Sequence, residues 1–110
     1  MNTAAPEASG SFQLVASANG RFVAKGPLTF ATARHAREQG LHCLAGAAAR
    51  ELEVDCGGIT ASDSAGLAVL LDWLGAVKRA GRTLRYTQLP QGLLALGRIS
   101  EVAELLERGV

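Results

Sequence analysis

The chain has 110 residues and a formal net charge of +1, from 11 basic and 10 acidic side chains. This length allows one compact domain with one core. Apolar residues make up 48% of the chain and charged residues 19%, so burial of side chains can offset the entropy lost on folding, and global disorder is excluded. Because the charges nearly balance, the chain has no basic field for binding many phosphates, and we expect no nucleic-acid partner.

Apolar runs in the sequence are short. A run such as AGLAVLL at 65–71 is far below the ~20 residues of a membrane helix, and the N-terminus lacks the blocks of a signal peptide. We therefore expect a cytoplasmic protein with no direct membrane insertion. The two cysteines, Cys43 and Cys56, fit reduced thiols better than a disulfide framework. With His35 and His42 they lack the spacing of a metal site, so we expect neither a metal nor another cofactor.

The N-terminal part of the chain predicts a β-hairpin. Residues 1–10 are small and polar and are expected to form a flexible lead-in to one folded domain over residues 11–110. Alternating apolar residues then predict strands at roughly 11–17 and 21–25. The Asn19-Gly20 pair between them is the strongest short signal for a hairpin turn.

A helix is predicted after the hairpin, where the apolar period changes from two to between three and four. Thr29 is its candidate N-cap and Gly40 its candidate end. Residues 41–50 could extend this helix or form a loose connection, since Gly46 disfavours a long continuous helix. The period is carried by Leu28, Ala31 and His35 or Ala36.

The middle of the chain predicts a short central strand followed by the longest helix. Residues 51–59 alternate apolar side chains and end near paired glycines, which is typical of a strand that leads into a loop. Residues 64–79 form one amphipathic stripe, with cations in the last turn and Gly81 as the stop. The stripe consists of Leu67, Leu70, Leu71, Leu74 and Val77.

The last part of the sequence predicts a strand at 82–89 and a helix at 90–98, with Pro90 in the first turn. A further short helix could begin at Ser100. Helices that alternate with strands in this way require crossover connections between parallel strands. We therefore predict a small α/β domain, with a mixed, mostly parallel sheet of about four strands and helices packed on it.

The element order and three short segments resemble the STAS domain family. The sharpest segment is DSAGL at 63–67, between the central strand and the long helix. GPLTF at 26–30 and VKRAGRTLRY at 77–86 support it. The family includes bacterial anti-sigma factor antagonists and the small cytoplasmic subunit of the phospholipid-transporting ABC complex that maintains outer-membrane lipid asymmetry.

The resemblance implies a choice between these two branches. In the antagonists, the phosphorylated hydroxyl lies immediately before the motif glycine, and here that position is Ala65. Without an oxygen at that position, the kinase cycle has no acceptor there. Ser64 matches the other hydroxyl of the motif, which implies the transport branch. The expected partner is then the ATPase subunit of an ABC transporter, in a complex peripheral to the inner membrane. The alternative is an anti-sigma factor antagonist in a partner-switching pathway.

The residues of the motif also have purely structural interpretations. Asp63 or Ser64 can simply cap the long helix, and Gly66 can allow another backbone to approach closely. Trp73 belongs to a second apolar stripe, which either joins a broad core or anchors a partner. The candidate partner-contact residues are Thr60, Ser62, Asp63, Ser64, Ala65, Gly66 and Trp73.

The sequence gives little support for an enzymatic function of the motif. A nucleophilic Ser64 would need a histidine base, and nothing in the sequence directs His35 or His42 toward it. The sequence also lacks a Walker-type phosphate loop. We therefore expect a protein that is not an enzyme.

Overall fold

The computed structural model describes residues 10–99, including the side chains of residues 10–95. Strands and helices alternate as the α/β prediction requires. The expected helix from Ser100 and nearly all of the lead-in at 1–10 lie outside the described residues. The elements are β1 (Gln13–Ala18), β2 (Arg21–Leu28), α2 (Ala33–Gly46), β3 (Glu51–Ser62), α3 (Ser64–Arg79), β4 (Thr83–Thr87) and α4 (Gln91–Ile99).

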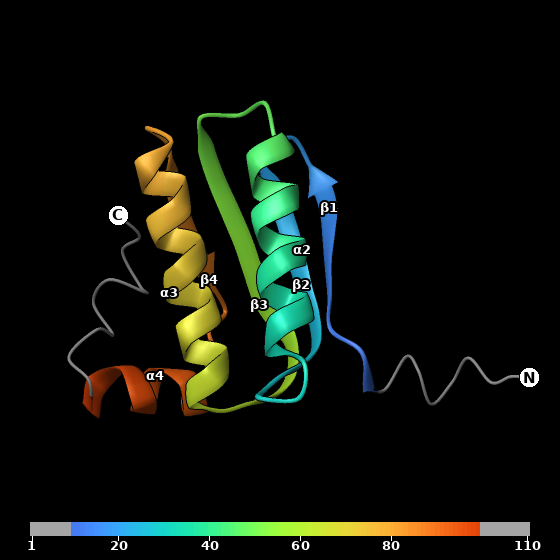
Figure 1. Ribbon diagram of the computed structural model, residues 1–110, viewed down its shortest axis with the longest axis vertical. Coiled ribbons are helices and arrows are strands. Elements are labelled where there is room, and N and C mark those ends of the chain that lie inside the picture. The colour runs from blue at the N-terminus through green and yellow to red at the C-terminus, as the bar shows by residue number, and fades with distance from the viewer. Residues whose placement is uncertain (1–9, 100–110) are drawn as a thin grey trace, which may run out of the picture.

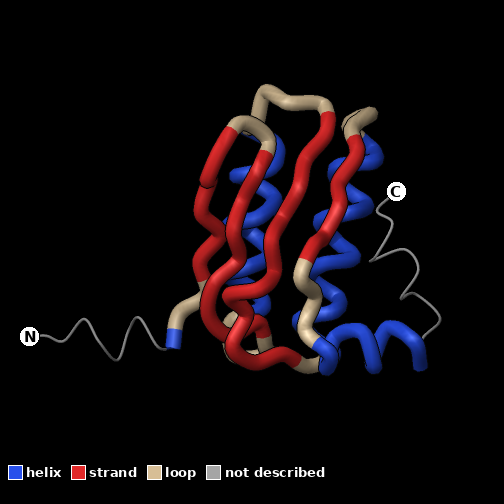
Figure 2. The backbone as a smooth tube through the Cα atoms, turned by 180° about the vertical axis from the view of Figure 1, so that it is seen from behind, coloured by secondary structure: helices blue, strands red, loops and turns tan. Residues whose placement is uncertain are grey.

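The four strands form one sheet in the order β1-β2-β3-β4. β1 and β2 form an antiparallel hairpin around Asn19 and Gly20, whereas the pairs β2–β3 and β3–β4 are parallel. Helices α2 and α3 lie side by side on one face of this sheet, and α4 lies at the end where both helices begin (Figure 1). Seen from behind, no described helix covers the opposite face (Figure 2). The prediction of a mixed, mostly parallel sheet is confirmed.

One hydrophobic core fills the space between the sheet and the two long helices. Alternate residues of β3 point into it, as the pattern of that strand predicts. On α3, the leucine stripe and the second apolar stripe are both buried, apart from the half-buried Leu71 and Ala76, so the helix faces a broad core. The buried residues of these two elements include Leu52, Val54, Cys56, Leu67, Val69, Leu70, Trp73, Leu74 and Val77.

Both central strands are longer than the sequence suggests. β2 continues through Leu28 and β3 through Ser62, and these two residues are partners in the parallel ladder. The paired glycines, Gly57 and Gly58, therefore lie inside β3, where the register shifts between the two strands. The expected end at these glycines was wrong because the neighbouring strand supplies the hydrogen bonds that keep this segment extended.

Helix α2 begins and ends later than predicted. Thr32, and not Thr29, occupies the N-cap position. The Thr32 hydroxyl accepts a hydrogen bond from Thr29 N at 3.1 Å and donates one to Pro27 O at 2.8 Å, which fixes a turn before the helix. Gly40 does not end the helix, which continues to Gly46.

Gly40 has a packing role that its sequence context does not reveal. It is buried, and a Cβ added there would overlap three atoms of the Trp73 indole. The missing side chain therefore lets the indole of α3 lie directly against the backbone of α2. This close contact explains why a glycine stands in the middle of a helix, where it is otherwise unfavourable.

Candidate functional site

The candidate site lies where the parallel strands end and the two long helices begin, beside α4 (Figure 1). Ligands and partners of open α/β sheets are typically bound at this edge. Thr60 and Ser62 belong to the end of β3, and Asp63 separates that strand from α3. The segment expected as a loop from Thr60 to Ser64 is therefore a strand end, a cap residue and the first residue of a helix. This rigid setting fixes the positions of its backbone groups.

Asp63 holds three backbone N–H groups from two different elements. Its Oδ1 accepts hydrogen bonds from Ala65 N at 2.9 Å and Gly66 N at 3.1 Å, which caps α3. Its Oδ2 accepts a hydrogen bond from Phe30 N at 3.0 Å, in the turn between β2 and α2. The bond from Phe30, followed by those from Gly66 and Ala65, lowers the pKa of the Asp63 carboxyl below its ordinary value. Asp63 is therefore the N-cap, and it also ties the turn that carries Phe30 to the start of α3.

Gly66 allows another backbone to approach closely, as the sequence suggests, but that backbone belongs to β2 of the same protein. It is buried, and a Cβ at this position would collide with the carbonyl oxygen of Leu28 at the end of β2. The first turn of α3 therefore packs directly on the backbone of β2. Gly66 therefore supports the site from inside the protein, and only its neighbours can contact a partner.

Ser64 is the exposed hydroxyl of the motif. It occupies the first position of α3, and its side chain forms no hydrogen bond with the other residues that the structure describes. Thr60 is also exposed, whereas Ser62 and Ala65 are half-buried. Ser62 faces the start of α4, since a Cβ added to Gly92 would lie 3.5 Å from its Oγ. The surface at this end therefore presents the Ser64 hydroxyl beside the small side chain of Ala65.

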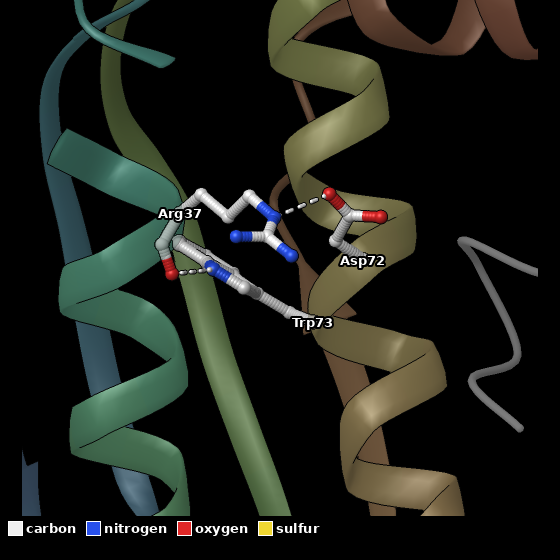
Figure 3. Close-up of polar contacts among 3 residues, drawn as sticks. All are labelled: Arg37, Asp72 and Trp73. Carbon is white, nitrogen blue, oxygen red and sulfur yellow. Dashed lines mark hydrogen bonds and ion pairs between the residues drawn. The ribbon is translucent and has the colours of Figure 1, made fainter. Parts of the chain in front are cut away.

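Trp73 lies in the core, which corrects the interpretation of this residue as a partner contact. Its side chain is fully buried, and its Nε1 donates a hydrogen bond to Arg37 O at 3.3 Å (Figure 3). The ring also packs against Phe12, with centroids 6.0 Å apart. Above it, Arg37 Nε donates to Asp72 Oδ2 at 3.0 Å, which links the exposed surfaces of α2 and α3 (Figure 3). The stripe that contains Trp73 therefore belongs to a broad core, because Gly40 makes room for it.

The structure adds Phe30 to this end of the molecule. Phe30 is 84% exposed, far more than Val15, the other large exposed apolar side chain of the described residues at 41%. It lines, together with Ala65, a groove of about 550 Å³ between α2 and α3. Phe30 falls in the segment GPLTF, but nothing in that pattern tells an exposed phenylalanine from a buried one.

The remaining reactive side chains do not converge on Ser64. His35 and His42 are exposed on α2, on its first and third turns. Burial, followed by the nearby Asp55, raises the pKa of the Cys56 thiol to about 12. Across residues 10–99, no three His, Cys, Asp or Glu side chains are grouped as metal ligands. None of the helices described between these residues is long and apolar enough to span a membrane.

This sheet, its two helices and the capped helix start are the fold of a STAS domain. The chain is similar to the structure of the unphosphorylated anti-sigma factor antagonist SpoIIAA, at a TM-score of 0.61 and 13% identity, over 87% of this chain and 84% of that one. It is also similar to part of SLC26A9, at a TM-score of 0.59 and 16% identity, over 80% of this chain and 17% of that one. For the murine anion transporter Slc26a9, the TM-score is 0.57 at 14% identity, over 81% of this chain and 14% of that one.

The sequence itself places the chain in one family. The family described as "Mlab, STAS domain" matches residues 14–107, which is most of the chain. The chain therefore belongs to this STAS family, whose members are in general regulatory or interaction domains and not catalysts. No curated protein sequence matches the chain.

Proposed function

We propose that this chain is a non-catalytic cytoplasmic STAS subunit of an ABC-type phospholipid transporter that maintains outer-membrane lipid asymmetry. In this role it binds the ATPase subunit, is peripheral to the inner membrane through the assembled complex, and leaves ATP hydrolysis to its partner. The family match over residues 14–107 supports this proposal. The exposed Ser64 at the rigid start of α3 is the structural observation that carries it.

The contact surface in this proposal is the end of β3 and the first turn of α3. Ser64 offers a hydroxyl that can donate or accept a hydrogen bond, and the half-buried Ala65 leaves space for close approach of a partner. Asp63 and Gly66 support this surface from within, because they fix the first turn against β2. Trp73 is left out of the contact because it is buried.

Binding would act on the ATPase by mass action. A partner that binds the assembled, active conformation more tightly than other conformations raises the population of that conformation by the difference in binding free energy. The STAS subunit can therefore support ATP turnover with no chemistry of its own. Its effect on turnover should saturate with the same concentration dependence as its binding.

The test is co-purification with the ATPase subunit, using wild-type chain and the variant Ser64→Arg. Ser64 is exposed, so a bulky cation there should leave the fold intact and lower the thermal midpoint only slightly, through its position at the positive end of α3, while complex formation is lost. Thr83→Arg, an exposed position at the start of β4, is the matched control and should bind as wild type does. Equal recovery of the ATPase with Ser64→Arg and wild type would refute the proposed surface.

The alternative role is that of an anti-sigma factor antagonist. SpoIIAA, whose structure is similar to this chain, is such an antagonist. Such a switch needs a hydroxyl that a kinase can reach. Of the two motif positions before Gly66, Ser64 has a hydroxyl and Ala65 does not. Phosphate on Ser64 in cells, together with capture of a kinase-like regulator in place of an ATPase, would favour this role.

A further inference from the structure

We infer that the groove between α2 and α3, which Phe30 lines, receives an amphipathic helix of the ATPase subunit. This inference rests on the proposed function and extends its contact surface from Ser64 across to α2. Phe30 would be the apolar anchor, and the charges on the rim of the groove would fix the orientation of the helix.

Phe30 is exposed on a turn that is held rigid from both sides. The turn is fixed internally by Thr32, whose hydroxyl bonds with Pro27 O and Thr29 N, and externally by Asp63 Oδ2 on Phe30 N. The backbone of Phe30 is therefore already fixed, and only the two side-chain torsions of this 84% exposed residue must be ordered when a partner covers it. Rigid aromatic anchors of this kind dominate many protein interfaces.

The groove beside Phe30 is lined in part by small apolar side chains. Ala33 comes from the first turn of α2, and Ala65 and Ala68 come from the first turns of α3. Its volume of about 550 Å³ is large enough for apolar side chains of a partner. Because it runs between two helices, it suits an elongated segment that packs along them, as an amphipathic helix does.

The charges on the rim specify the complementary partner. Arg37 and Asp72 neutralise each other across the groove at 3.0 Å. Arg34 and Glu38 remain, and neither has an ion-pair partner among the residues that the structure describes. They lie four residues apart on α2, so they are one helical turn apart on the same face. A helix with an acidic and a basic residue one turn apart, flanking an apolar side chain, would match both charges.

The test measures the affinity of the purified chain for the ATPase subunit by titration calorimetry. Phe30→Ser should raise Kd by about tenfold or more, and Arg34→Glu by about fivefold or more. Val15→Ser removes the other exposed apolar side chain, on β1, and Lys78→Glu reverses an exposed cation at the far end of α3. Both controls should stay within about twofold of wild type. All four variants should fold as wild type does, because each position is exposed, and only Lys78→Glu should lower the thermal midpoint slightly, since it places an anion in the last turn of α3.

The outcomes separate this inference from the proposed function. If Ser64→Arg abolishes binding while Phe30→Ser and Arg34→Glu bind as wild type does, the ATPase remains the partner but the groove does not receive it. If the wild-type chain does not bind the ATPase, both proposals fail. If sedimentation shows that the chain alone is a dimer that Phe30→Ser dissociates, the groove is occupied by a second copy and the inference is overturned.

Discussion

The packing of Gly66 on β2 makes a prediction that can be worked out from the structure. In Gly66→Ala, the new Cβ would meet the carbonyl oxygen of Leu28, a backbone atom that cannot rotate away as a side chain does. To restore ordinary contact, α3 and the end of β2 must separate by on the order of 1 Å. Overpacking of this kind costs about 1–3 kcal/mol.

Gly66→Ala also stabilises the helix through the higher helix propensity of alanine, and the control variant Gly75→Ala measures that contribution alone. Alanine is favoured over glycine in a helix by about 1 kcal/mol, so the net loss for Gly66→Ala should be up to about 2 kcal/mol. Gly75→Ala places the same change in the same helix, where the nearest atom is the flexible guanidinium of Arg79 at 3.2 Å. This control should be neutral or slightly more stable than wild type.

Urea unfolding followed by circular dichroism measures both variants. Gly66→Ala should lower the free energy of unfolding, and Gly75→Ala should not. Because the turn with Phe30 follows Leu28 directly, Gly66→Ala should also weaken binding of the ATPase if the proposed surface is correct. A Gly66→Ala protein that is as stable as Gly75→Ala would refute the account of how α3 packs on β2.

Three further predictions follow from the remaining contacts. Gly40→Ala should destabilise the protein by about 1–3 kcal/mol, because the new Cβ would overlap the buried indole of Trp73. Gly46→Ala, at the end of α2 where the new Cβ meets open space, should not be destabilising, and thermal unfolding compares the two variants. Asp63→Asn should lower the thermal midpoint at pH 7, because an amide would place a donor against a backbone N–H. Folding lowers the pKa of Asp63, so the stabilisation by its carboxylate is complete above the ordinary pKa of about 4 and is lost as the pH falls below it. A difference in thermal midpoint between wild type and Asp63→Asn that stayed the same at pH 3 would contradict this role of the carboxylate. Iodoacetamide at pH 8 should label the half-buried Cys43 of the native protein and spare the buried Cys56, as read by mass spectrometry; equal labelling would contradict the burial.

The parts of the fold that local patterns control could be predicted from the sequence. The turn at Asn19 and Gly20 joins two strands as expected, and α3 has the predicted bounds because Asp63 and the apolar stripe act within a few residues. The ends of β2 and β3 could not be predicted. They depend on parallel pairing between segments more than 30 residues apart, such as Leu28 with Ser62.

The candidate site shows the same limit. The cap by Asp63 is a local interaction and was expected, but the bond from its second oxygen to Phe30 N joins residues 33 positions apart. The burial of Trp73 depends in the same way on Gly40, which the sequence alone marks as the end of a helix. The sequence therefore locates the motif, and the tertiary contacts decide which of its neighbours are exposed.

Hydrogen–deuterium exchange of the chain with and without the ATPase subunit tests the central claim most directly. If the start of α3 is the docking surface, the ATPase should slow exchange at residues 60–68 and at the turn that contains Phe30. The strands β1 and β4 should show no added protection. Protection confined to these two strands, with unchanged exchange around Ser64, would contradict the account.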